Sequence, residues 1–126
     1  MRVLVVDDSK ISREFIASHL REIGVDKIDE AEDGIDAINK IKMLPPDSKY
    51  DLITLDVVMP RKAGLEALRD IKLLSPKTKI IICSSNNDIR TVQTAIGFGV
   101  DGYIVKPFTR QKFLEVLWRS LKIEHK

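Results

Sequence analysis

Three short apolar segments of this chain each end on charged residues whose side chains could share one site. The acidic residues are Asp7, Asp8 and Asp56, and the basic one is Lys106. If the segments are parallel strands, their carboxyl ends meet at one sheet edge, where ligands bind in open α/β folds. Two carboxylates 4 Å apart repel by about 1 kcal/mol in water and about 4 kcal/mol at an effective dielectric of 20, so a cation is expected among them. The four residues therefore predict a metal and phosphate site with an Asp as phosphoryl acceptor.

The donor types narrow the choice of metal and reaction. Carboxylate oxygens with no His or Cys in the motif select Mg²⁺, Mn²⁺ or Ca²⁺ over Zn²⁺, and Mg²⁺ suits a site shared with a phosphate. A carboxylate can take a phosphoryl group as a mixed anhydride, and this transfer needs positioning and charge neutralisation. Lys106 would supply one positive charge, and Ser84, directly after the run Ile80–Cys83, would supply a hydrogen bond. Taken singly, each residue is more often structural: a helix cap, a loop start or a turn former.

Five alternations of strand and helix would position these side chains. The expected strands are Arg2–Val6, Lys27–Ala31, Asp51–Leu55, Lys79–Cys83 and Asp101–Val105. Apolar stripes at helical spacing predict helices through residues 11–23, 35–43, 65–74, 89–98 and 113–121. Ser9 and Thr109 are the expected N-caps of the first and last helices. This alternation requires right-handed crossovers and a parallel sheet covered on both faces, which is a doubly wound α/β fold.

Composition excludes several classes of protein. A chain of 126 residues, 44% hydrophobic and 32% charged, is expected to form a single globular domain. It has no apolar stretch long enough to span a membrane, and its one cysteine, Cys83, cannot form an internal disulfide, so a cytoplasmic location is expected. Residues 1–60 carry 8 Lys and Arg against 13 Asp and Glu, whereas residues 61–126 carry 13 against 6, so the second half is cationic. With no recognition helix or basic stripe, direct binding to nucleic acid is not expected.

Together these motifs resemble the receiver domain of two-component response regulators, most closely its single-domain, chemotaxis-type members. The segments that carry the resemblance, over nearly the whole chain, are Val5–Ser9, Ala31–Gly34, Asp51–Pro60, Gly64–Leu65, Cys83–Ser85 and Gly102–Phe108. The resemblance implies one receiver domain over residues 1–126. It also implies a flavodoxin-like fold, in which a five-stranded parallel sheet of order 2-1-3-4-5 carries five helices.

The resemblance assigns roles to the acidic cluster. Asp56 is the phosphoacceptor. Asp8 and Asp56 bind Mg²⁺ directly, together with the main-chain carbonyl of Val58, while Asp7 acts mainly through water. Ala63 stands where the family often has Asp. Val58 and Asn86 occupy variable positions that flank the path of the water that removes the phosphoryl group, so an apolar side chain at Val58 is expected to slow self-dephosphorylation.

The resemblance also implies a switch. Ser84 and Lys106 hold the phosphoryl oxygens, and a cis peptide bond between Lys106 and Pro107 aims the lysine into the site. Ser84 moves toward the phosphoryl group, and Tyr103 rotates into the space that it leaves. The fourth helix, fifth strand and fifth helix then change as a partner surface.

The function that follows is a signalling switch rather than an enzyme acting on external substrates. A histidine kinase is the expected phosphodonor, and a target such as the flagellar motor switch is the expected partner of a monomeric protein. A phosphorelay or phosphate-sink receiver would have the same site residues, and a receiver cut from a DNA-binding regulator would look alike. An aspartyl-phosphate phosphatase ranks low because those enzymes carry a second Asp at the position of Val58.

Overall fold

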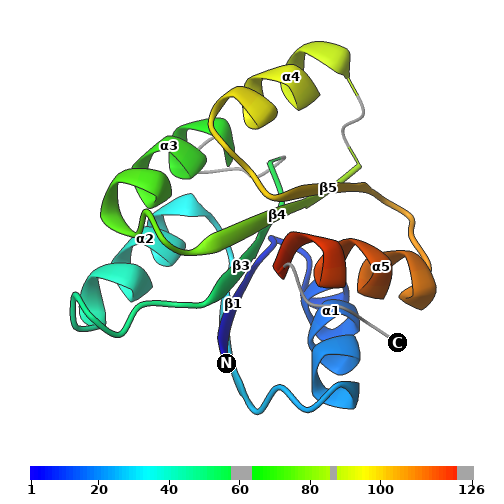
Figure 1. The fold of residues 1–126 in the computed structure, drawn as a ribbon, viewed down its shortest axis with the longest axis horizontal. Helices are drawn as coiled ribbons and strands as arrows, with labels where there is room; N and C mark the ends of the chain where they lie inside the picture. The colour runs from blue at the N-terminus through cyan, green and yellow to red at the C-terminus, as the bar shows by residue number, and fades with distance from the viewer. Residues whose placement is uncertain (58–63, 86–87, 122–126) are drawn as a thin grey trace.

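The fold was analysed in a computed structural model, which describes residues 1–57, 64–85 and 88–121. Strands and helices alternate along the chain (Figure 1). The strands are β1 Arg2–Val6, β2 Lys27–Ala31, β3 Leu52–Leu55, β4 Lys79–Ser84 and β5 Gly102–Val105. The helices are α1 Lys10–Glu22, α2 Gly34–Met43, α3 Gly64–Leu74, α4 Ile89–Gly97 and α5 Arg110–Leu121. Within the described ranges, none of these helices has the length and apolar character needed to cross a membrane.

All five strands are parallel and lie in the order β2-β1-β3-β4-β5, so the expected fold class and strand order are confirmed. The chain leaves β1, adds β2 on one side, and then returns to place β3 on the other side. Val6 pairs with Ala31 of β2 and with Leu55 of β3, which brings the carboxyl ends of these strands level. The order of the strands therefore reverses at β1, where α/β sheets open a ligand crevice.

Helices cover both faces of the sheet. α1 and α5 lie on one face, and α2, α3 and α4 lie on the other (Figure 1). The side chains of β1 alternate between two cores: Val3 and Val5 pack with α1 and α5, while Leu4 and Val6 pack with α2, α3 and α4. Because both faces are buried at the centre of the sheet, β1, β3 and β4 are mainly apolar runs rather than alternating ones, whereas the edge strand β2 is polar and largely exposed.

Two strands begin one residue later than their patterns predict. Asp51 and Asp101 precede β3 and β5 instead of starting them. The carboxylate of Asp51 accepts a hydrogen bond from the Arg2 amide at 2.8 Å, and that of Asp101 accepts one from the Ile80 amide at 2.9 Å. Both Asp residues thus tie the amino ends of neighbouring strands together.

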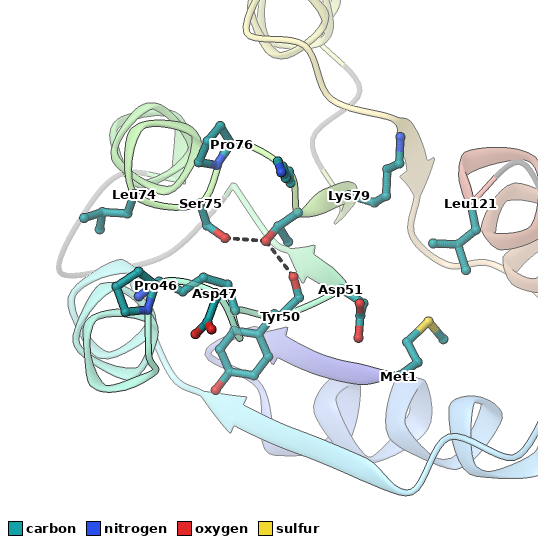
Figure 2. Close-up of a pocket in the computed structure, with 13 residues that line it drawn as sticks. Met1, Pro46, Asp47, Tyr50, Asp51, Leu74, Ser75, Pro76, Lys79 and Leu121 are labelled. Carbon is teal, nitrogen blue, oxygen red and sulfur yellow. Dashed lines mark hydrogen bonds between the residues drawn. The ribbon is translucent and has the colours of Figure 1, made fainter.

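The amino edge of the sheet also carries a wide hollow of about 850 Å³ between the β3 and β4 ends (Figure 2). Buried polar groups in its wall bond to one another: Thr78 Oγ1 donates to the Tyr50 carbonyl at 2.6 Å and pairs with the Ser75 hydroxyl. The Tyr50 hydroxyl donates to Asp29 Oδ2 at 2.7 Å. These contacts join α3 and β4 to the start of β3, far from the charged residues at the other edge.

Gly102 allows α5 to approach β5 closely. A Cβ on Gly102 would lie 2.6 Å from Ser120 Oγ and 2.8 Å from Val116 Cγ1, both on α5. We expect Gly102→Ala to destabilise the protein by about 1–3 kcal/mol, because α5 must shift to make room. Urea unfolding measures this cost.

Gly97→Ala is the matched control, because no neighbouring atom lies within 4 Å of a Cβ at this helical position. That variant should be neutral or more stable by up to about 1 kcal/mol. Equal unfolding free energies for the two variants would contradict the close contact between β5 and α5.

Cys83 lies in β4, fully buried in the core under α1 and α5. Burial raises the pKa of its thiol to about 12, and the nearby charges of Asp7 and Asp56 add to the rise, while Lys106 opposes it. The folded pKa exceeds the usual thiol value of 9.0, so this group stabilises the fold fully below pH 9. That stabilisation is lost as the pH rises toward 12.

We therefore expect Cys83→Ala to weaken the dependence of the unfolding free energy on pH above pH 9. The difference in slope should approach about 1.4 kcal/mol per pH unit. Urea titrations of both proteins at several alkaline pH values measure this difference in slope. The packing lost in the alanine variant shifts the unfolding free energy equally at every pH, so it does not affect the slope. Parallel pH profiles would show that the thiol does not contribute.

Candidate functional site

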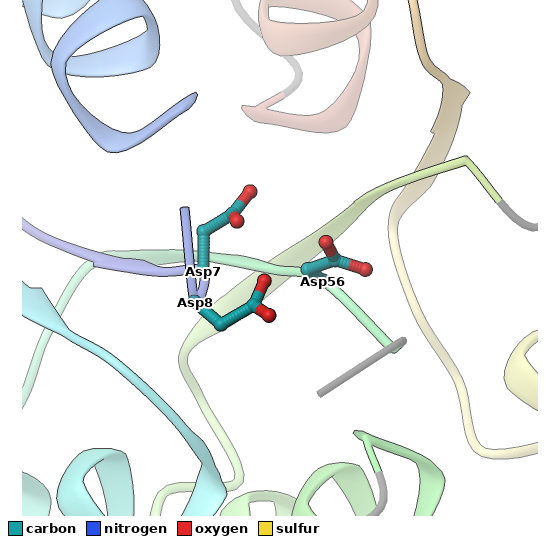
Figure 3. A group of neighbouring side chains, drawn as sticks. All are labelled: Asp7, Asp8 and Asp56. Carbon is teal, nitrogen blue, oxygen red and sulfur yellow. The ribbon is translucent and has the colours of Figure 1, made fainter. Parts of the chain in front are cut away.

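The charged residues predicted at strand ends gather at the carboxyl edge of the sheet. Asp7 and Asp8 directly follow β1, Asp56 follows β3 and Lys106 follows β5. One carboxylate oxygen of each Asp lies within 4.8 Å of the others (Figure 3). The backbone holds the strand ends in place, because the Asp56 amide donates to the Val6 carbonyl at 3.0 Å.

The three carboxylates differ in their access to solvent. Asp7 is 1% exposed and Asp56 is 6% exposed, whereas Asp8 is open to solvent. Both oxygens of Asp7 accept hydrogen bonds within the protein: Oδ1 from the Ser9 amide at 2.9 Å and Oδ2 from Lys106 at 2.5 Å. The Asp7 carboxylate is therefore occupied by its hydrogen bonds from Ser9 and Lys106. The Asp8 carboxylate is accessible to solvent.

Lys106 joins the ends of β1, β3 and β5. Its Nζ lies 2.5 Å from Asp7 Oδ2 and 3.1 Å from Asp56 Oδ2, distances typical of charge-assisted hydrogen bonds. Burial lowers the pKa of Lys106, but the hydrogen bond to Asp7 and the charge of Asp56 outweigh it and raise the pKa above its usual value. For Asp7, burial outweighs the bonds from Lys106 and Ser9 and raises the pKa. The ammonium is thus held as a cation between two buried carboxylates.

The residues predicted for phosphoryl binding and switching surround this cluster. Ser84 ends β4, is fully buried, and pairs in register with Val105. The Lys106 amide donates to the Ser84 carbonyl at 2.8 Å, and the peptide bond between Lys106 and Pro107 is cis. Tyr103 is half-buried on the α4 side of β5; burial raises its pKa, and the charges of Asp56 and Asp88 add to the rise.

Three positions singled out in the sequence lie outside the described residues. These are Val58, Ala63 and Asn86. The main-chain carbonyl expected as a metal ligand therefore stays a prediction, and so does the effect of an apolar side chain at Val58.

Sequence reasoning missed two residues of α1 that contact the site. Ser12 Oγ lies 3.3 Å from Lys106 Nζ. Arg13 donates through Nη1 to the Asp7 carbonyl at 2.8 Å and through Nε to Glu30 Oε1 at 2.8 Å. Their position in the first turn of α1, next to the acidic pair, was the signal that the sequence offered. The packing of α1 decides which of its side chains contact the site.

The donor set fits a magnesium ion. The described cluster consists of carboxylates only, which are hard oxygen ligands suited to this metal. Asp8 and Asp56 would hold the ion, with Asp7 behind a water molecule, because both Asp7 oxygens already accept hydrogen bonds from the protein. Bound there, the cation would offset the mutual repulsion of the carboxylates.

We expect Mg²⁺ to stabilise the protein and the Asp8→Asn substitution to weaken this effect. At 100 times its Kd, a bound ion adds about 2.7 kcal/mol to the unfolding free energy. Thermal unfolding at increasing Mg²⁺ concentration measures the gain. Asp47→Asn, which changes an exposed Asp in the hollow at the opposite edge, is the control and should respond as the unmodified protein does. Equal Mg²⁺ responses in both variants would contradict the assigned ligands.

Comparison with known proteins agrees with this geometry. The response regulator receiver domain family matches residues 3–117, and the chain belongs to that family. Protein CcdB of Bacillus subtilis is 44% identical over 120 residues, covering 95% of this chain and 97% of that protein. Chemotaxis protein CheY of Treponema pallidum is 38% identical over 121 residues, covering 96% and 83%.

Solved structures agree with both the fold and the family. A chain of the CheX–CheY–BeF₃–Mg²⁺ complex from Borrelia burgdorferi superposes with a TM-score of 0.89 at 29% identity, covering 98% of this chain and 90% of that one. Chemotaxis protein CheY4 of Vibrio cholerae gives a TM-score of 0.82 at 29% identity, covering 94% and 97%. The present chain is thus a receiver of the CheY type, and a phosphorylation-dependent signalling role follows from that class.

Proposed function

We propose that Asp56 accepts a phosphoryl group from a histidine kinase in a Mg²⁺-dependent reaction, and that the modified protein changes its affinity for a protein target. The observation that carries the proposal is the cluster of Asp7, Asp8 and Asp56 at the crevice of the sheet, in which the Lys106 ammonium bonds both Asp7 and Asp56. A buried carboxylate beside a cation and an open metal position suits in-line phosphoryl transfer.

In the transfer, an Asp56 oxygen forms a bond to phosphorus as the bond from phosphorus to the donor breaks. Lys106, 3.1 Å from Asp56 Oδ2, is placed to follow the charge onto a phosphoryl oxygen. The hydroxyl of Ser84, at the end of the adjacent strand, would donate to another. A Mg²⁺ held by Asp8, Asp56 and the Val58 carbonyl would supply the remaining charge neutralisation. Water hydrolyses the acyl phosphate and resets the protein.

The added charge of about −2 would act on the β4 and β5 ends. Ser84 is buried there, and the half-buried Tyr103 is close enough to Asp56 to feel its charge. Both observations support the predicted switch, in which Ser84 moves toward the phosphoryl group and Tyr103 rotates into the space that it leaves. Ile89 and Ile96 of α4 and Val105 of β5 are 70%, 60% and 40% exposed. This α4-β5-α5 surface would be the part that a target reads.

Chemotaxis is the favoured pathway. CheY proteins of Treponema pallidum and Listeria monocytogenes are 38% and 35% identical to this chain over nearly its whole length. The CheX–CheY complex also has a receiver bound to a protein partner in the presence of BeF₃ and Mg²⁺. A target at the flagellar motor switch, expected from the resemblance to chemotaxis-type receivers, is the specific partner that we propose. A phosphorelay or phosphate-sink role would use the same site.

The test combines intact-mass spectrometry with partner capture. With Mg²⁺ and acetyl phosphate, we expect the protein to gain one phosphate and to retain a target from a lysate of its own cells at least about tenfold better. Chelation of Mg²⁺ should abolish both effects. Phosphate uptake without any change in capture would favour a relay or sink, and absence of uptake would overturn the proposal.

A further inference from the structure

Within the described residues, the ammonium of Lys106 makes three contacts, and each comes from a different element. Asp7 Oδ2 follows β1, Asp56 Oδ2 follows β3, and Ser12 Oγ belongs to α1, at 2.5, 3.1 and 3.3 Å respectively. A lysine ammonium has three N–H donors, so the three acceptors account for all of them. The contact from Ser12 is the one that comes from neither the phosphoacceptor nor its acidic neighbours.

The position of Ser12 is determined by the start of α1. Its amide donates to Ser9 Oγ at 3.3 Å in the N-cap, and the Ser9 amide donates to Asp7 Oδ1 at 2.9 Å. The next residue, Arg13, donates to the Asp7 carbonyl at 2.8 Å. The hydroxyl of Ser12 is therefore held in a defined place relative to the acidic cluster.

The side of this contact that faces α1 and the segment after β5 is largely apolar. A hollow of about 340 Å³ between α1 and the segment after β5 is lined by Ile11, Ser12, Phe15, Ile16, Lys106, Pro107 and Phe108. Apart from Ser12 and Lys106, these described lining residues are apolar. A water molecule that replaced the Ser12 hydroxyl would find few other partners there, so loss of the hydroxyl leaves one N–H of the lysine poorly satisfied.

We propose that Ser12 is a positioning residue that holds the Lys106 ammonium for phosphoryl transfer to Asp56. The inference rests on the proposed function and adds a residue to it. The carboxylates of Asp7 and Asp56 alone would attract the ammonium to a position between them. The Ser12 hydroxyl on α1 restrains it from a third direction. The lysine then needs little reorganisation to follow the charge from Asp56 to the incoming phosphoryl oxygen.

The experiment measures the phosphorylation rate constant with acetyl phosphate as a function of donor and Mg²⁺ concentration. We expect Ser12→Ala to lower the rate constant at saturating donor by about 3- to 10-fold. The half-saturating concentrations of donor and Mg²⁺ should stay unchanged, because the Ser12 hydroxyl bonds Lys106 rather than the carboxylates proposed to hold the ion. Ser12→Thr, which keeps the hydroxyl, should restore the rate, and Ser12→Cys, with a weak acceptor, should not.

Two comparisons separate positioning from a general effect on the fold. Ser18→Ala removes a hydroxyl of the same helix that bonds the Phe15 carbonyl at 2.7 Å, and it should leave the rate unchanged. In a Lys106→Ala background, Ser12→Ala should cause no further loss, because its partner is already absent. The double-mutant cycle measures the coupling between Ser12 and Lys106. A serine with only a structural role would lower the rate by the same factor in both backgrounds.

A wild-type rate in Ser12→Ala, or an equal loss in the Lys106→Ala background, would overturn the inference while leaving Asp56 phosphorylation intact. Failure of the unmodified protein to gain phosphate would instead overturn the proposed function as well. Thermal unfolding shows whether each variant remains folded. If Ser12→Ala does not fold, the rates of Ser12→Thr and Ser12→Cys test the inference instead.

Discussion

Asp56→Asn should gain no phosphate from acetyl phosphate and Mg²⁺ under conditions in which the unmodified protein gains one. The carboxylate oxygen is the nucleophile, and an amide oxygen is too weak a nucleophile to form the acyl phosphate. The substitution is nearly isosteric and keeps an acceptor 3.1 Å from Lys106, so the fold should survive. Intact-mass spectrometry over time follows the reaction, and the loss should exceed about 100-fold.

Asp51→Asn is a matched control for this result. Asp51 precedes β3 at its amino end, whereas Asp56 follows the same strand at its carboxyl end, and the Asn variant keeps an acceptor for the Arg2 amide. It should take up phosphate at the unmodified rate. Undiminished uptake by Asp56→Asn, or phosphate mapped by peptide sequencing to Asp7 or Asp8, would contradict the assignment.

Lys106→Ala should have two large effects. Phosphorylation should slow by about 100- to 1000-fold, the usual cost of removing one preorganised donor to a developing charge. The protein should also lose about 3–5 kcal/mol of stability, because Asp7, 1% exposed, and Asp56, 6% exposed, would lose the cation that offsets the cost of their burial. The second effect should shrink as Mg²⁺ is added, since a cation in the cluster offsets the same repulsion.

Urea unfolding with and without Mg²⁺ measures the stability effect. Lys72→Ala is the control, because Lys72 is also a half-buried lysine, but its ammonium bonds the Gly99 carbonyl at 3.3 Å, away from the acidic cluster. That variant should change stability by less than about 1 kcal/mol and should not change the phosphorylation rate. A Lys106→Ala protein as stable as the Lys72→Ala protein, in the absence of Mg²⁺, would show that the carboxylates do not need the ammonium.

Local patterns predicted the elements well, because continuous apolar runs and helical stripes reflect burial on both faces of a sheet. The boundaries that moved were set by long-range hydrogen bonds. Asp51 and Asp101 were predicted as first residues of strands, but their carboxylates cap the amides of Arg2 and Ile80 on neighbouring strands. The local sequence around each Asp does not reveal a hydrogen-bond partner that lies 49 or 21 residues away.

The order of the strands could not be worked out from the patterns alone. Five strands that alternate with helices are compatible with many arrangements, and the order 2-1-3-4-5 came from the resemblance of the motifs to a known family. The contacts of α1 were missed for a related reason. Ser12 and Arg13 reach Lys106 and Asp7 because of the way α1 packs on the sheet, in a core that it shares with side chains from α5 and β4.

By itself, the sequence determined that Asp7, Asp8, Asp56 and Lys106 stand at the ends of apolar strands. Charged side chains are rarely buried, so each apolar run ends at the first charged residue. Only the tertiary structure decided that β1 and β3 are neighbours and that the lysine from β5 reaches across to both of their carboxylates. It also decided which carboxylate is buried and which faces water. Charge and hydrophobicity are properties of single residues, whereas distance and burial depend on how all the elements pack together.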